Sequence, residues 1–168
     1  MKYIKNKTGF TIAELLVALT ISMLLLAAVA FAFQSSMINY QENEDIFVVT
    51  NSARQALFRM TTQLRTADAV DPNAPSNQCT FFTSNGENIT YDYRSADNKL
   101  YLITNSNGNE YVLCDNVTAM TFTKDTFIVD LESGPEIRVK SVQISMTVVN
   151  GDIEKTISSA AVIRRNLN

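Results

Sequence analysis

The stretch GFTIAELLVALTISMLLLAAVAFAF, residues 9–33, decides the fold of this chain of 168 residues. It opens with a glycine and an aromatic residue and continues as a run of apolar helix formers, in which Glu14 is the only ionisable side chain. Residues 10–33 are long enough to cross a hydrocarbon core of about 30 Å as one helix. The sequence therefore predicts a transmembrane segment that begins a few residues into the chain.

The charges on the two sides of this stretch differ in sign. Residues 1–9 carry three lysines, and acidic residues follow the stretch from Glu42. This asymmetry predicts a leader in the cytoplasm and an exported chain. Two ordinary alternatives fit such a segment: a signal peptide cleaved after Ala28–Ala30, which has the A-x-A pattern, or an uncleaved single-pass anchor.

Glu14 argues against both alternatives, because a carboxylate near the centre of a membrane span costs about 2.5–3.5 kcal/mol. One role for it is local, since Thr11–Glu14 has the S/T-x-x-E pattern of a helix capping box. The other is electrostatic: cleavage after Gly9 would leave an ammonium group on Phe10, which Glu14 of a neighbouring helix would neutralise. We favour the second role because capping alone does not explain the basic leader.

The order of these features resembles the processing site of type IV prepilins and type II secretion pseudopilins. The family pattern is a short basic leader, a glycine at Gly9, an aromatic residue at Phe10 and a glutamate four residues later, at Glu14, followed by an apolar helix. Ala13 departs mildly from the branched aliphatic residue that is usual there. The resemblance implies cleavage between Gly9 and Phe10 by a membrane-embedded prepilin peptidase, N-methylation of Phe10 and an assembly salt bridge through Glu14.

The helix is expected to extend well beyond the membrane, because Gly and Pro are absent between Gly9 and Pro72. One helix is predicted from about Thr11 to Ala69, and residues 34–70 form its amphipathic half. Apolar residues recur there at spacings of three and four and predict one packing face: Ile46, Val49, Ala53, Leu57, Met60, Leu64 and Ala67. Polar residues lie opposite: Gln55, Arg59, Thr62 and Arg65.

Residues 71–168 are predicted to form a β-rich domain outside the cytoplasm, after a breaker-rich linker at residues 71–77. Four turn sequences separate runs of β-branched and aromatic residues: Asn85-Gly86, Ser95–Asn98, Asn107-Gly108 and Asn150-Gly151. Strands are predicted at Phe81–Thr83, Ile89–Tyr93, Leu100–Ile103, Tyr111–Leu113, Val117–Thr123, Phe127–Leu131, Val139–Val149 and Ile153–Ile163. The predicted fold class is α+β and pilin-like, with a long N-terminal helix packed on an antiparallel β-sheet meander.

Cys79 and Cys114 are the only cysteines. Outside the cytoplasm such a pair favours a disulfide, worth roughly 3 kcal/mol. The alternative is two buried free thiols.

The composition predicts no catalytic, cofactor-binding or metal site, and no enzyme activity. The chain has no histidine, so no ordinary nucleophile–base pair can be drawn. The acidic residues Asp125, Asp130, Glu132 and Glu136 match no calcium loop, and we interpret them as a solvated turn. A net charge of −3 without a basic patch excludes nucleic acid as the expected partner.

Several phrases resemble PilW-type minor pilins, and J-type pseudopilins next: MTTQLRTA at residues 60–67, ITYDY at 89–93 and VTAMTF at 117–122. This resemblance implies a non-catalytic minor pilin, held in the inner membrane by one span with its C-terminal domain outside, and later part of the pilus. The implied partners are the prepilin peptidase, other minor and major pilins or pseudopilins, and the inner-membrane assembly platform. Three alternatives stay open: a type II secretion or competence pseudopilin, a membrane-anchored ligand-binding module, and a protein secreted after Ala30.

Overall fold

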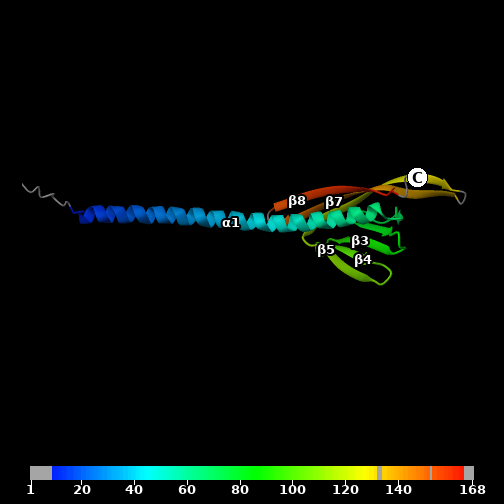
Figure 1. Ribbon diagram of the computed structural model, residues 1–168, viewed down its shortest axis with the longest axis horizontal. Coiled ribbons are helices and arrows are strands. Elements are labelled where there is room, and N and C mark those ends of the chain that lie inside the picture. Colours follow the sequence, from blue (N-terminus) through cyan, green and yellow to red (C-terminus); the bar gives the residue numbers. More distant parts are fainter. Residues whose placement is uncertain (1–8, 132–133, 152, 165–168) are drawn as a thin grey trace, which may run out of the picture. The chain divides into compact units, whose positions relative to one another are not determined.

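The computed structural model describes residues 9–131, 134–151 and 153–164 (Figure 1). They form one helix, α1 (Ile12–Arg65), followed by strands β1 (Ala69–Val70), β2 (Gln78–Phe82), β3 (Asn88–Arg94), β4 (Lys99–Thr104), β5 (Asn109–Cys114), β6 (Val117–Leu131), β7 (Gly134–Asn150) and β8 (Ile153–Val162). The chain divides into two compact units, Met1–Glu44 and Asp45–Asn168, so the second half of α1 shares a unit with all the strands.

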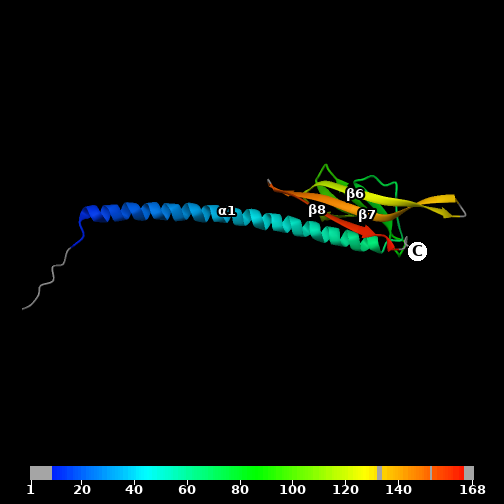
Figure 2. The same ribbon diagram turned by 90° about the horizontal axis from the view of Figure 1, so that it is seen from above.

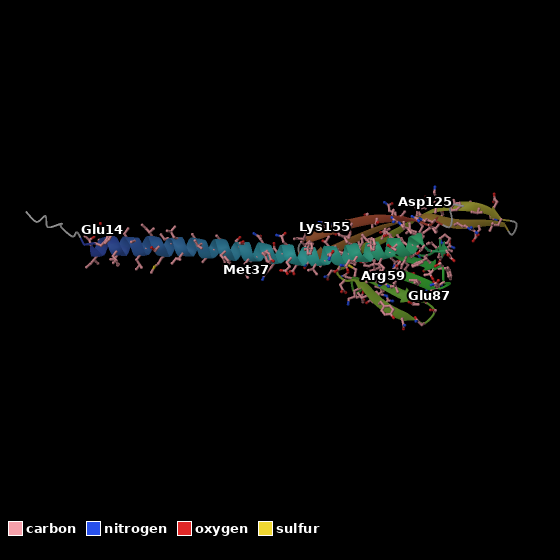
Figure 3. The ribbon with its side chains drawn as sticks, in the orientation of Figure 1. Glu14, Met37, Arg59, Glu87, Asp125 and Lys155 are labelled. Carbon is pink, nitrogen blue, oxygen red and sulfur yellow. The ribbon has the colours of Figure 1, made fainter. Side chains whose placement is uncertain are left out.

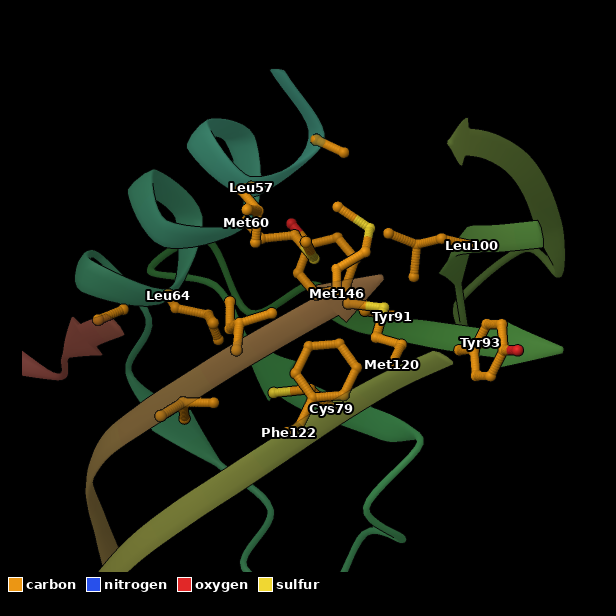
Figure 4. Close-up of a cluster of buried hydrophobic side chains, with 14 of the residues drawn as sticks. Leu57, Met60, Leu64, Cys79, Tyr91, Tyr93, Leu100, Met120, Phe122 and Met146 are labelled. Atoms are coloured by element: carbon orange, nitrogen blue, oxygen red, sulfur yellow. The ribbon is translucent and has the colours of Figure 1, made fainter. Parts of the chain in front are cut away.

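The second half of α1 packs through the predicted apolar stripe. Ala53, Leu57, Met60 and Leu64 are buried, and they meet side chains from both sheets in one core, as Figure 4 shows around Met60. The opposite residues Gln55, Arg59, Thr62 and Arg65 are exposed, as predicted.

The helix ends at Arg65, four residues before the predicted end at Ala69. The N–H groups of Thr66 and Ala67 donate to the carbonyls three residues earlier, at 3.1 and 3.2 Å, which tightens the last turn. Ala69 and Val70 then pair with β2 as the short strand β1, which the sequence analysis missed. Pairing with β2 therefore places Ala69 and Val70 in a strand, although the sequence predicted that they belong to the helix.

The strands form two antiparallel sheets, where the sequence predicted one meander. The five-stranded sheet has the order β1-β2-β3-β4-β5, and the three-stranded sheet has the order β6-β7-β8. The chain leaves the first sheet at Asn116, whose φ of +58° is a left-handed conformation that asparagine tolerates. This turn lies between β5 and β6, which belong to different sheets.

Most predicted strands and turns are confirmed, and the main difference lies in β6. Gly86, Gly108 and Gly151 take positive φ at the three Asn-Gly turns. β6 is one strand where two were predicted, because a register shift between Asp125 and Thr126 absorbs the polar interruption.

Hydrogen bonds join the two sheets at the linker of residues 71–77. The Phe122 N–H in β6 donates to the Ser76 carbonyl at 2.7 Å. The Lys124 ammonium in β6 donates to the Ala74 carbonyl at 2.6 Å and also reaches the carbonyl of Gln78 at 3.3 Å. The linker is thus held against β6 by backbone and charge-assisted hydrogen bonds.

Cys79 and Cys114 are free, buried thiols in the structure, so the predicted disulfide is not present. Cys79 lies in β2 and Cys114 in β5, with β3 and β4 between them. Three strand spacings of about 4.8 Å separate them by roughly 14 Å, whereas a disulfide needs Cα atoms within about 7 Å. Burial raises the pKa of Cys79 to about 12 and that of Cys114 to about 11.

An arginine ties together three strands of the larger sheet. The Arg94 guanidinium in β3 donates two hydrogen bonds to the Glu110 carboxylate in β5, at 2.9 and 2.6 Å. Its Nε donates to Asp92 at 2.9 Å, and its central carbon lies 4.4 Å from the centre of the Tyr101 ring in β4. The hydrogen bonds from Arg94 lower the pKa of Glu110 below its ordinary value.

We expect both thiols to resist a maleimide in the folded chain at mildly alkaline pH, because burial and raised pKa values keep them protonated. In urea both should react, giving two adducts by mass spectrometry. A chain that takes up label in urea only after chemical reduction would contain the disulfide and would contradict the structure.

We also expect Glu110→Gln to change how stability depends on pH. Because the folded-state pKa of Glu110 is lowered, its stabilisation is complete above the ordinary value of 4.5 and is lost as the pH falls through the lowered value. Urea unfolding should therefore show Glu110→Gln less stable than the parent chain at neutral pH, and the gap should close in acid. Glu154→Gln is the control, since Glu154 is exposed and makes none of the ion pairs among the described residues; the same trend in that variant would refute the assignment.

Candidate functional site

A reciprocal capping box fixes the start of α1. The Thr11 N–H and Thr11 hydroxyl both donate to Glu14 Oε2 at 2.9 Å, and the Glu14 N–H donates to Thr11 Oγ1 at 3.2 Å. These bonds satisfy N–H groups that the first turn of a helix leaves without partners. Gly9 and Phe10 precede the cap and are not helical.

The two oxygens of Glu14 are used differently. Both bonds from Thr11 end on Oε2, and Oε1 accepts none of the hydrogen bonds among the described residues. Glu14 is exposed at the start of α1, where Figure 3 labels it. Capping therefore leaves one carboxylate oxygen open to a cation from outside the chain.

The helix surface beyond the cap is apolar and uncovered. Every residue from Ile12 to Phe33 is exposed. α1 is long and apolar enough to cross a membrane, and no part of its most apolar window is buried inside the described chain. Such a surface requires a cover of lipid or of other apolar helices.

The hydroxyl groups in this apolar segment are satisfied within the helix. Thr20 Oγ1 donates to the Val17 carbonyl and Ser22 Oγ to the Ala18 carbonyl, each at 2.8 Å. These back-bonds lower the cost of placing hydroxyls in lipid. Glu14 is therefore the one strongly polar side chain of the segment from Ile12 to Phe33.

The structure brings Gly9, Phe10 and Glu14 together at one helix end and places Cys79 and Cys114 in the other unit. The three leader lysines lie outside the described residues. No group of His, Cys, Asp or Glu suited to holding a metal occurs among the described residues, and Glu132 lies outside them.

Phe58, in the second half of α1, is an exposed aromatic residue that the sequence patterns did not single out. Its side chain is 72% exposed although its neighbour Leu57 is buried. The available signal was its position, one residue off the apolar stripe and four residues after Arg54.

Comparison with known proteins adds one finding. Residues 4–30 match the prokaryotic N-terminal methylation motif. Neither a curated protein nor a solved structure matches the chain. The motif, together with the capped and uncovered apolar helix, supports a type IV pilin or pseudopilin that a prepilin peptidase processes.

Proposed function

We propose that this chain is a minor pilin, a structural and non-catalytic subunit that takes part in initiating or assembling a type IV pilus. It is cut between Gly9 and Phe10, waits in the inner membrane with its C-terminal domain outside the cytoplasm, and then joins other pilins at the assembly platform. The observation that carries the proposal is the uncovered apolar face of α1, most of which lies within the residues that match the methylation motif.

The backbone around Gly9 is suited to cleavage. Proteases bind their substrates as extended chain, and the capping box keeps Gly9 and Phe10 outside the helix. A Cβ atom on Gly9 would meet nothing within 4 Å, so packing in this chain does not require a glycine there. The proposed cleavage gives this glycine a role, since a residue without a side chain fits an extended chain into a narrow enzyme cleft.

Cleavage creates the cation that Glu14 needs. The new Phe10 amine is positively charged, and Phe10 is 90% exposed, so it can reach a neighbouring helix. In a bundle of apolar helices each charge is costly alone, and pairing Glu14 Oε1 with the amine of another subunit favours one axial register.

The N-terminal peptide provides a direct test. We expect mass spectrometry of membrane-extracted protein to show a chain that begins at methylated Phe10. An intact Met1 would support a plain membrane anchor, and a start at Phe31 would support secretion; either result would refute the proposal.

Two substitutions at Glu14 separate charge from capping. Glutamine at this position can still accept the Thr11 hydrogen bonds, whereas alanine cannot. If the charge is needed, Glu14→Gln and Glu14→Ala should both lower incorporation into filaments, by about a hundredfold or more, because breaking a buried ion pair costs about 3–5 kcal/mol.

Sheared filaments and membranes are compared by immunoblot for each variant, and membrane insertion should be unchanged in both. Normal incorporation of Glu14→Gln beside a defective Glu14→Ala would show that Glu14 acts as a cap alone.

A further inference from the structure

An open groove runs between the second half of α1 and the edge strand β8. Two adjoining hollows form it, each about 410 Å³, and Arg65 lines both. In Figure 2 the red end of β8 lies beside the last turns of α1. β8 is the outer strand of its sheet, so its far edge is open.

The groove is cationic and partly aromatic. Arg54 and Arg65 from α1 and Arg164 after β8 line it, together with the exposed Phe58 ring and several hydroxyl groups. None of its lining residues is acidic, and none of the three arginines forms an ion pair among the described residues. A partner for this groove should therefore present carboxylates beside apolar or aromatic side chains.

The same helix carries a segment of that chemistry. Glu42, Glu44 and Asp45 are exposed, and Tyr40 and Phe47 beside them are 70% and 66% exposed. Tyr40, Glu44 and Phe47 follow the spacing of four and then three that places residues on one helix face.

The groove residues of α1 share a face in the same way. Arg54, Phe58 and Arg65 are spaced by four and seven residues. The two faces are thus complementary in charge, and each includes at least one aromatic side chain.

The acidic segment is not paired with the groove of its own chain. Asp45 and Arg54 lie in the same unit, nine residues apart on α1, which places their backbones about 13.5 Å apart along the axis at 1.5 Å per residue. Neither forms an ion pair among the described residues, so we assign the acidic segment to the groove of another chain.

We propose that the α1–β8 groove of one subunit binds the acidic segment Tyr40–Phe47 of a second copy of this chain. The inference rests on the proposed function, because assembly into a filament would place copies of α1 side by side, and a parallel stagger between two copies would align the acidic segment with the groove. A stagger of ten to twenty residues, roughly 15–30 Å, aligns Glu44 or Asp45 with Arg54 or Arg65.

Cysteine crosslinking of full-length chains in membranes tests this contact. Phe47→Cys is placed on one tagged copy and Phe58→Cys on a second copy with a different tag, which leaves every charge in place. A bis-maleimide should join them as a heterodimer. Arg59→Cys replaces Phe58→Cys as the control, because Arg59 is also exposed but lies outside the residues that line the groove; the 47/58 yield should exceed the 47/59 yield about fivefold.

Charge reversal provides the second arm. Arg54→Glu with Arg65→Glu in the Phe58→Cys copy should reduce the heterodimer about fivefold, and Glu44→Arg with Asp45→Arg in the Phe47→Cys copy should restore it. Equal yields for the 47/58 and 47/59 pairs, or a 47/58 yield that charge reversal does not change, would overturn the proposal.

The N-terminal mass of the same samples distinguishes the two proposals. Methylated Phe10 without a 47/58 crosslink would refute the groove contact but would still support the proposed pilin function. A charge-dependent crosslink between chains that retain Met1 would support the groove contact and would refute the proposed pilin function.

Discussion

The first half of α1 presents an apolar surface that the described residues of its own unit leave exposed. From Ile12 to Phe33 the side chains are exposed on all sides of the helix. Water would oppose this exposure at about 25 cal/mol per Å² of apolar surface, so the segment requires lipid or other helices. The remaining features of the segment are consistent with that requirement: Thr20 and Ser22 bond back to the helix, and the only charge lies in its first turn.

The second unit meets the opposite requirement, since it must be stable in water. There α1 has one buried side, and the two sheets share it through residues such as Met60, Phe81 and Ile144. Polar contacts then fix the sheets to each other. Tyr93 Oη donates to the Thr118 carbonyl at 2.7 Å, and Lys124 holds the linker carbonyls. Loss of either contact would leave a partly buried polar group without its partner, which is costly.

Local patterns in the sequence predicted what depends on neighbouring residues. The Thr11–Glu14 box, the apolar stripe of α1 and the Asn-Gly turns are set by spacing within a few residues, and the structure contains all of them. Features that depend on contacts between residues far apart in the sequence could not be predicted from such local spacing.

The division into two sheets is such a feature, because it depends on which strands pair, and the alternation of apolar residues does not reveal that. The cysteines show the same limit: their separation in sequence allows a bond, but the strand order places two other strands between them. At the N-terminal site, the sequence indicated the position of Glu14 but not that its two oxygens are used unequally.

The capping box has a consequence for maturation. The bonds that begin α1 come from Thr11 and Glu14, and neither residue precedes the Gly9–Phe10 bond. If the Gly9–Phe10 bond is cut as proposed, the start of α1 keeps all of its capping bonds, and the cut changes the electrostatics of the helix end without changing its cap. The proposed change from precursor to assembling subunit then needs no refolding of α1.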